Sequence, residues 1–299
     1  MSAHTSKLSI GIIGIGRWGR NLVREFDGLA NIVAVSSKGG EENRKWLSAT
    51  YPAIAYVRDH DEILSNPSIQ AVVIATPIAT HYEVAKAALE AGKDVFLEKP
   101  MTDDPKRAEA LMALAKKKRQ VLFVGHVFLF HPVLEKIKEL TAGDPVRYAH
   151  FSWNKYGSFH EDIAWNLACH DLAVAIALFG IPEKLEKCGE WGGVSAGDLL
   201  SLHAGFSGNR RCTIDINRIS NQKRKAVTLV TAAGTVLLWE NDVLHVLDKE
   251  TGAFRLAYAP QESALQRECI LFLKAVVDRK NPPEHAAIPF ETVKALSAL

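Results

Sequence analysis

Short apolar runs and longer amphipathic segments alternate along the first 125 residues. The apolar runs predict β-strands at Leu8–Ile13, Asn31–Val35, Ala71–Ala75, Asp94–Leu97 and Val121–Gly125. The segments between them predict helices at Trp18–Asp27, Glu41–Thr50, His81–Ala91 and Asp104–Lys118. One of the strand runs, Ala71–Ala75, is apolar throughout, as in a strand buried on both faces of a parallel sheet. This alternation predicts a doubly wound parallel sheet.

Polar residues mark the ends of one of these helices. Thr80 and Glu83 have the spacing of a capping box, in which the Thr oxygen accepts a helix N–H and the Glu side chain reaches back to the cap. Gly92 follows Ala91 and supplies the left-handed residue that ends many helices. We therefore expect a capped helix between Thr80 and Gly92.

The pattern changes after Gly125. Helices are predicted at Val133–Leu140 and Ile163–Phe179, with a strand at Val146–Trp153 between them. Six strand-like runs then follow without helices between them: Lys184–Trp191, Leu199–Phe206, Arg211–Asn217, Ala226–Thr231, Thr235–Trp239 and Asp242–Leu247. Such a series predicts an open, mainly antiparallel sheet. A last helix, Ser263–Arg279, is expected to pack back on the first domain.

The fold class is therefore α/β in residues 1–125, followed by an α+β domain in residues 126–299. A length of 299 residues fits two domains. The formal net charge of +2 disfavours general nucleic-acid binding, which needs a strongly basic face.

No apolar run is long enough for a membrane span, and the segment Met1–Lys7 lacks the apolar core of a signal peptide. The four cysteines form no C-x-x-C pair, which disfavours a zinc site or disulfide scaffold. We expect a cytoplasmic protein with reduced thiols.

A glycine motif lies between the first predicted strand and the first predicted helix. Gly14, Gly16 and Gly19 form G-x-G-x-x-G, with Arg17 and Trp18 inside the motif. The first glycine allows a tight turn, the second lets the backbone approach a pyrophosphate, and the third allows helix–strand packing. The helix N-terminus then offers free N–H groups to the phosphates. The motif in this context predicts a Rossmann domain that binds a dinucleotide.

The end of the second predicted strand indicates which dinucleotide is bound. NAD-binding domains usually place Asp or Glu there, to accept hydrogen bonds from the ribose hydroxyls. This chain has Ser36, Ser37 and Lys38 instead, and a hydroxyl with an ammonium attracts a 2′-phosphate. NADP is therefore favoured. NAD remains the alternative, with Glu41 or Glu42 in the carboxylate's place.

Three further segments combine with the glycine motif. They are Ala75-Thr76-Pro77 with Thr80-His81, then Glu98-Lys99-Pro100, then residues 165–171, Trp-Asn-Leu-Ala-Cys-His-Asp. Together they resemble the glucose-fructose oxidoreductase/inositol dehydrogenase/rhizopine catabolism (Gfo/Idh/MocA) family, in the family's order and over nearly the whole chain. The resemblance implies a Rossmann domain, a second domain with an open sheet, and a homodimer or homotetramer formed through that sheet.

By this resemblance Lys99 is the catalytic lysine and His170 the family's histidine. Hydride transfer from an alcohol carbon requires the hydroxyl proton to leave as well, and a lysine at a strand's carboxyl end can share that proton. His170 can relay it at neutral pH. Position 166 is Asn where the family pattern has Asp. Asn166 can position a substrate hydroxyl or His170, but it cannot act as a base.

The resemblance also implies residues around the cofactor. Thr76, Pro77 and His81 are expected to line the cofactor cleft, and Glu98 to contact the nicotinamide ribose. His126 follows Gly125 and either faces the cleft or caps the domain junction.

Aromatic residues Trp165 and Tyr156, with Trp153 and Phe159, either stack on a sugar or nucleobase or pack in the core. The acids and histidines at 160–162 and 170–171 lack a compact ligand spacing, so no metal site is expected.

We therefore expect an NAD(P)-dependent oxidoreductase that moves a hydride to or from a hydroxyl or carbonyl carbon. A sugar, cyclitol or nucleotide sugar is the favoured small-molecule substrate. Two alternatives remain open at this point. One is a reductase of an imine, tetrapyrrole or diol, and the other is a dinucleotide-binding regulator without turnover.

Overall fold

The computed structural model describes residues 7–282 and 287–299, so the N-terminal segment examined for a signal peptide lies outside it except for Lys7. The chain divides into two compact units. Residues up to Gly125, together with Leu265–Phe290, form the N-terminal unit. His126–Ala264 and Glu291–Leu299 form the C-terminal unit.

The N-terminal unit is built on a six-stranded parallel sheet with the order β3-β2-β1-β4-β5-β6. Its strands are β1 (Ser9–Ile13), β2 (Asn31–Ser36), β3 (Ala55–Val57), β4 (Ala71–Ile74), β5 (Asp94–Glu98) and β6 (Leu122–Gly125). The strand order reverses direction beside β1. In such sheets ligands bind outside the carboxyl ends of the strands at this switch point.

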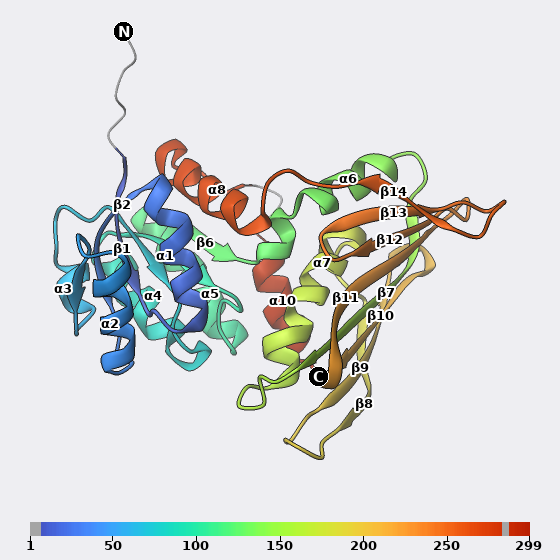
Figure 1. Cartoon of the computed structure of the whole chain (residues 1–299), viewed down its shortest axis with the longest axis horizontal. Coiled ribbons are helices and arrows are strands. Elements are labelled where there is room, and N and C mark those ends of the chain that lie inside the picture. Colours follow the sequence, from blue (N-terminus) through green and yellow to red (C-terminus); the bar gives the residue numbers. More distant parts are fainter. Residues whose placement is uncertain (1–6, 283–286) are drawn as a thin grey trace, which may run out of the picture. The chain divides into compact units, whose positions relative to one another are not determined.

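Helices connect these strands and supply the rest of the core. They are α1 (Arg17–Leu29), α2 (Glu41–Thr50), α3 (Asp61–Leu64), α4 (His81–Glu90) after a 3₁₀ turn η1 (Ile78–Thr80), α5 (Pro105–Lys118) and α8 (Ala264–Asp278). Although α8 comes from the far end of the sequence, it lies beside α1 (Figure 1). The rings of Phe26 and Phe272 meet edge-on there at 6.1 Å.

The structure adds two elements to those predicted in this unit and corrects one expectation. The short β3 and α3 were not predicted, because three or four residues are too few to show a period. The prediction of a capping box at Thr80 is wrong. The hydroxyl of Thr80 donates to the Pro77 carbonyl or the Thr76 hydroxyl, 2.8 Å from each, and caps no helix N–H. Gly92 does adopt the left-handed conformation, with φ 77°.

The C-terminal unit contains an eight-stranded sheet with the order β14-β13-β12-β11-β7-β10-β9-β8. All pairs are antiparallel except β7 with β10. The strands are β7 (Val146–Tyr156), β8 (Lys184–Trp191), β9 (Leu199–Phe206), β10 (Arg210–Asn217), β11 (Ile219–Thr231), β12 (Val236–Glu240), β13 (Val243–Leu247) and β14 (Phe254–Tyr258). The last strand was not predicted. The mainly antiparallel sheet is confirmed.

The helical elements of this unit and of the C-terminus are η2 (Val127–Phe130), α6 (Pro132–Leu140), η3 (Ala164–Ala168), α7 (Cys169–Phe179), η4 (Ser207–Asn209) and α10 (Ile288–Leu296). Helix α7 packs on β7 and β10. Residues along β9 alternate between buried and partly exposed, as expected for a sheet with one covered face. None of the helices in the described ranges has the length and apolarity of a membrane span.

The predicted helix Ile163–Phe179 is divided. Its first turn, η3, is a π-helix that carries Trp165 and Asn166, and the α-helical part begins at Cys169. The side chain of Asp162 caps this turn by accepting from the N–H groups of Ala164 at 2.8 Å and Trp165 at 3.0 Å. Single π-helical turns are rare in proteins, and those that occur often lie at functional sites.

Candidate functional site

The glycine loop joins β1 to α1, and its three glycines meet different constraints. A Cβ at Gly14, where φ is +94°, would lie 2.6 Å from the Ala75 carbonyl oxygen. A Cβ at Gly19 would lie 2.1 Å from the Gly14 carbonyl oxygen. A Cβ at Gly16 would meet no atom within 4 Å. The first and third glycines are therefore required by the fold, whereas Gly16 leaves an exposed stretch of backbone open.

This open backbone fits a pyrophosphate. Gly16 is the N-cap residue of α1, and no side chain caps the helix there. The first N–H groups of α1 therefore remain available to an anion, which the helix dipole also favours. Arg17 and Trp18 are exposed beside this turn.

Trp18 connects the glycine loop to the end of β5. Its indole Nε1 donates to Glu98 Oε1 at 2.5 Å, and the backbone N–H of Lys99 donates to Glu98 Oε2 at 3.2 Å. Glu98 is buried, and burial raises its pKa to about 7 against the opposing effects of Trp18 and Lys99. Glu98 therefore holds Trp18, and with it one side of the glycine loop, at the end of β5.

A pocket of about 220 Å³ opens at the carboxyl end of β2. It is lined by Ser37, Lys38, Gly39, Gly40, Glu41, Arg44, Tyr56 and Arg58. The Ser37 hydroxyl accepts from the Gly39 N–H at 3.1 Å, and Tyr56 donates to the Ser37 carbonyl at 2.8 Å. Three cationic side chains and one carboxylate line the pocket, so its charge fits a phosphate.

The residues expected near the reacting end of the cofactor lie after β4 and β5. His81 is buried, and its ring nitrogens lie 2.8 Å from the carbonyl oxygens of Pro100 and Thr76. Burial lowers the pKa of His81, although both carbonyl contacts raise it. His81 thus ties Thr76 to the segment that carries Lys99, which is half-buried and precedes a cis proline. Pro77 is exposed.

His170 is the centre of an aromatic cluster in the C-terminal unit. Its ring centroid lies 5.2 Å from that of Phe128, 5.6 Å from that of Trp153 and 6.5 Å from that of His126. His126 and His170 are both buried. The structure thus brings together two of the predicted site residues, His126 at the N-terminal end of η2 and His170 on α7.

Lys225 from β11 enters the same cluster. Its Nζ lies 3.7 Å from the ring centroid of Trp153 and 4.0 Å from that of Phe128. Nζ also donates to Asp171 Oδ1 at 2.5 Å. Burial raises the pKa of Asp171, and the charge of Lys225 lowers it. The histidine is therefore flanked by a paired cation as well as by aromatic rings.

Trp165 and Asn166 lie on η3, one turn before His170, and both are partly exposed. Tyr156 is 69% exposed and packs on Phe159, with ring centroids 5.2 Å apart. Strand alternation places Tyr156 on the opposite face of β7 from Trp153. Tyr156, which was predicted to stack on a substrate or to pack in the core, thus lies apart from the cluster around His170.

Comparison with known proteins shows which family this chain resembles. Residues 8–126 match an oxidoreductase family with an NAD-binding Rossmann fold, GFO_IDH_MocA. The curated UDP-N-acetylglucosamine 3-dehydrogenase of Acidithiobacillus ferrooxidans is 29% identical over 216 residues, 65% of this chain and 66% of that protein. The chain belongs to the Gfo/Idh/MocA oxidoreductase family. The resemblance found in its motifs is confirmed.

Other members of the Gfo/Idh/MocA family are similar over different lengths. The uncharacterized oxidoreductase YdgJ of Escherichia coli K12 is 33% identical over 249 residues, 78% of this chain. The alignments with these two curated relatives span 66% of each relative, just under two thirds. The structure of the A. ferrooxidans protein has a TM-score of 0.86 at 22% identity and covers 98% of this chain and 96% of that one.

A more distant structure is that of the 3-ketoreductase KijD10 of Actinomadura kijaniata, solved as a mutant in complex with TDP-benzene and NADP. It has a TM-score of 0.86 at 17% identity, with 98% of this chain and 97% of that chain covered. At such identity the likeness is one of fold.

Two groups of residues in this family member were missed by sequence reasoning. Arg44 and Arg58 line the pocket at β2, and Arg58 follows the short strand that has no visible period. Lys225 belongs to the basic run Lys223-Arg224-Lys225, a composition that is typical of a solvated surface. A signal was present, because Lys225, Val227 and Leu229 alternate along β11, so all three point to the covered face.

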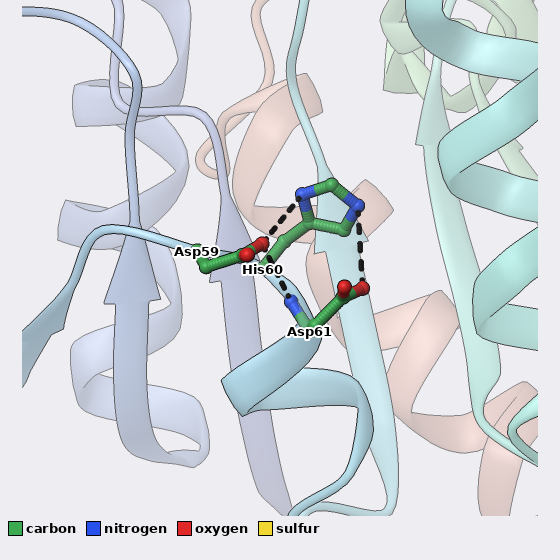
Figure 2. Close-up of side chains that lie close together, drawn as sticks. All are labelled: Asp59, His60 and Asp61. Carbon is green, nitrogen blue, oxygen red and sulfur yellow. Dashed lines mark hydrogen bonds and ion pairs between the residues drawn. The ribbon is translucent and has the colours of Figure 1, made fainter.

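A group of potential metal ligands lies elsewhere in the N-terminal unit. In the described part of the chain, Asp59, His60 and Asp61 are the one group whose ligand atoms gather within 4.8 Å (Figure 2). The His60 ring nitrogens lie 3.7 Å from Asp59 and 3.8 Å from Asp61. The three residues are consecutive and both acids are exposed, so their neighbourhood follows from sequence alone.

Proposed function

We propose that this protein is an NADP-preferring oxidoreductase that transfers a hydride between the nicotinamide and a hydroxyl or carbonyl carbon of a sugar or nucleotide sugar. The observation that carries the cofactor part is the pair of anion-binding features in the N-terminal unit. The open backbone at Gly16 accommodates a pyrophosphate, and the cationic pocket at the end of β2 accommodates a 2′-phosphate.

The preference for NADP rests on the charge of that pocket. Lys38, Arg44 and Arg58 line it together with a single carboxylate, Glu41. A ribose bearing only hydroxyl groups gains little from three cations, whereas a phosphate gains charge-assisted hydrogen bonds. Ser37 provides a further hydroxyl at the same wall.

The chemical roles follow from the residue types and from the family. A bound nicotinamide accepts or supplies the hydride. Lys99 takes the hydroxyl proton during oxidation and returns it during reduction, since it follows the carboxyl end of β5, where such sheets bind ligands. His170 passes that proton on or orients the substrate, and Asn166 holds a substrate hydroxyl.

The substrate class is supported by two features. The curated relative at 29% identity is named as a dehydrogenase of UDP-N-acetylglucosamine. In the C-terminal unit, the rings of Phe128 and Trp153 pack against His170. The partly exposed Trp165 lies about one turn before His170. Aromatic faces stack well on the apolar faces of sugars and bases.

Calorimetric titration of the whole chain with NADPH and NADH tests the cofactor part. We expect NADPH to bind at least about tenfold more tightly, a difference equal to about one charge-assisted hydrogen bond. Arg58→Ala should weaken the binding of NADPH and leave the affinity for NADH unchanged. Lys45→Ala is the matched control, because Lys45 lies on the same helix as Arg44 and outside the pocket. Tighter binding of NADH would overturn the preference.

Turnover tests the catalytic part. Nucleotide sugars, free sugars and cyclitols are assayed by the absorbance of the reduced nicotinamide, with the wild type and Lys99→Ala. We expect turnover of a sugar-containing substrate and its loss in the variant. Full turnover by Lys99→Ala would contradict the assigned role. Tight dinucleotide binding with no turnover of any of these substrates would contradict the proposed reaction.

A further inference from the structure

Two buried glutamates of the N-terminal unit come from distant parts of the sequence. Glu98 ends β5, and Glu268 lies on α8. Glu268 has no exposed surface, and neither of its carboxylate oxygens has a hydrogen-bond partner among the described residues. A buried carboxylate without a donor costs several kcal/mol, so its protonation state requires an explanation.

Packing fixes α8 where Glu268 sits. The ring of Phe272, one turn after Glu268, lies 5.5 Å from that of Phe96 and 5.8 Å from that of Phe123. At the end of α8, Arg279 pairs with Asp94 at 2.5 Å. Helix α8 is therefore held on β5, the strand that ends in Glu98, and Glu268 is fully buried one turn before Phe272.

Burial and neighbouring charges act on both carboxyls. Burial and the charge of Glu98 both raise the pKa of Glu268 well above its usual value. Burial raises the pKa of Glu98, which the charge of Lys99 lowers. Cys269 lies next to Glu268, and Glu25 on α1 adds a further negative charge that acts on this thiol.

A negative charge on Glu268 is disfavoured, because this side chain is fully buried and the like charge of Glu98 acts on it. Their hydrogen bonds indicate which one carries the proton. Glu98 accepts from both Trp18 and Lys99, which favours its ionised form. Glu268 receives no such donor among the described residues. The proton therefore belongs on Glu268 and the charge on Glu98.

We propose that Glu98 and Glu268 hold one proton between them in mildly alkaline solution, and that the charge left on Glu98 makes the glycine-loop site favour the oxidised dinucleotide over the reduced one. The inference rests on the proposed function, because it requires a dinucleotide at this loop. Glu268 is a positioning residue in this arrangement, since it acts through Glu98.

The direction of the preference follows from charge. The oxidised nicotinamide ring carries one positive charge more than the reduced ring. Glu98 ends a central strand at the edge where such sheets bind ligands, and it bonds directly to Trp18 of the loop. A negative charge in a poorly solvated place acts over several ångströms, so it stabilises the cationic ring selectively.

The first test compares dissociation constants for both redox forms of the more tightly bound dinucleotide, between pH 6 and pH 9. In the wild type, the preference for the oxidised form should rise as pH passes through about 7, where Glu98 loses its proton. Glu98→Gln should abolish this pH dependence and reduce the preference by about tenfold, as expected for the loss of one nearby charge. Glu109→Gln, at an exposed position of α5, is the control.

The outcomes separate this inference from the proposed function. If the wild type binds neither redox form, the proposed function fails. If both forms bind and Glu98→Gln leaves their ratio unchanged, the function stands and the inference is overturned.

A second test does not depend on any ligand or on the folding of Glu98→Gln. The infrared spectrum of the wild-type chain at pH 8, where Glu98 has lost its proton, should contain the carbonyl band of a protonated carboxylic acid, shifted in heavy water. The band should disappear in Glu268→Gln and persist in Glu109→Gln. Absence of the band in the wild type, or its survival in Glu268→Gln, would show that Glu268 holds no proton.

Discussion

The indole Nε1 of Trp18 lies 2.5 Å from Oε1 of the buried Glu98. This bond joins a residue inside the glycine motif to the last residue of β5, 80 positions later. Because Trp18 is 40% exposed, the bond does little for the core. It instead holds one side of the loop beside the switch point of the sheet.

Trp18→Phe removes this donor and keeps an aromatic ring of similar shape. We expect dinucleotide affinity to fall by about threefold to tenfold, since a hydrogen bond to a charged group contributes roughly 1.5–3 kcal/mol and part of that is lost to solvent exchange. The melting temperature should change little. Calorimetric titration measures the effect, with Trp191→Phe, an exposed residue of β8, as the control. Unchanged affinity would show that the bond does not order the loop.

Gly16 and Gly19 should respond oppositely to alanine. Gly16→Ala should keep the wild-type melting temperature, because its Cβ meets nothing within 4 Å. It should weaken dinucleotide binding by more than about tenfold, since the methyl group occupies the approach to the pyrophosphate. Gly19→Ala should destabilise the fold by about 3 kcal/mol or more, as its Cβ would lie 2.1 Å from a backbone oxygen.

Chemical denaturation and titration of the two glycine variants separate these effects. Normal binding by Gly16→Ala, or normal stability of Gly19→Ala, would contradict the respective assignment.

Lys225→Met should destabilise the protein at neutral pH by about 3–5 kcal/mol, the usual cost of leaving one partner of a buried ion pair alone. Without Lys225, the pKa of Asp171, already raised by burial, rises further. A carboxyl with a raised pKa in the folded state loses stability as pH rises through that pKa. The deficit of Lys225→Met should therefore shrink as pH falls and Asp171 takes up a proton.

Urea denaturation from pH 3 to pH 8 measures this deficit. The double variant Lys225→Met/Asp171→Asn should recover much of the loss, because no unpaired charge remains. Lys223→Met, at an exposed position of the same strand, should have no effect. A deficit that does not change with pH would contradict an ionised Asp171.

Asp198 should support the C-terminal unit into strongly acid conditions. Its carboxylate accepts from the N–H groups of Gly193 and Val194 at 2.6 Å each, and from the Ser195 hydroxyl at 2.5 Å. These bonds hold its pKa well below the usual range of an aspartate. A carboxyl with a depressed pKa contributes stability above its unfolded pKa and loses it only as pH falls through the folded value.

Asp198→Asn should therefore lower the melting temperature at neutral pH, and the difference should persist when ordinary carboxylates are already protonated. Thermal unfolding between pH 3 and pH 7 measures it, with the exposed Asp27→Asn as the control. A difference that vanishes near pH 4 would show that the bonds around Asp198 are weaker than their geometry indicates.

The sequence alone determined the elements whose pattern is long and continuous. The alternation of apolar runs with amphipathic segments predicted a parallel sheet, and the wholly apolar run at β4 is typical of a strand covered on both faces. The glycine spacing and the segment at Lys99 identified the family, because the residues of each motif are close neighbours in the sequence. Helix Glu41–Thr50 and strand Lys184–Trp191 were predicted to the residue.

Tertiary structure decided every relationship between residues distant in sequence. Glu98 meets Trp18, and Lys225 meets Asp171 and Trp153, because sheet order and helix packing bring them together. Arg58 joins the pocket at Lys38 through the order β2–β3, which no local pattern reports. Local propensity acts over a few residues, whereas burial and charge pairing depend on the whole fold. The chemistry of the site therefore lies where the sequence pattern says least.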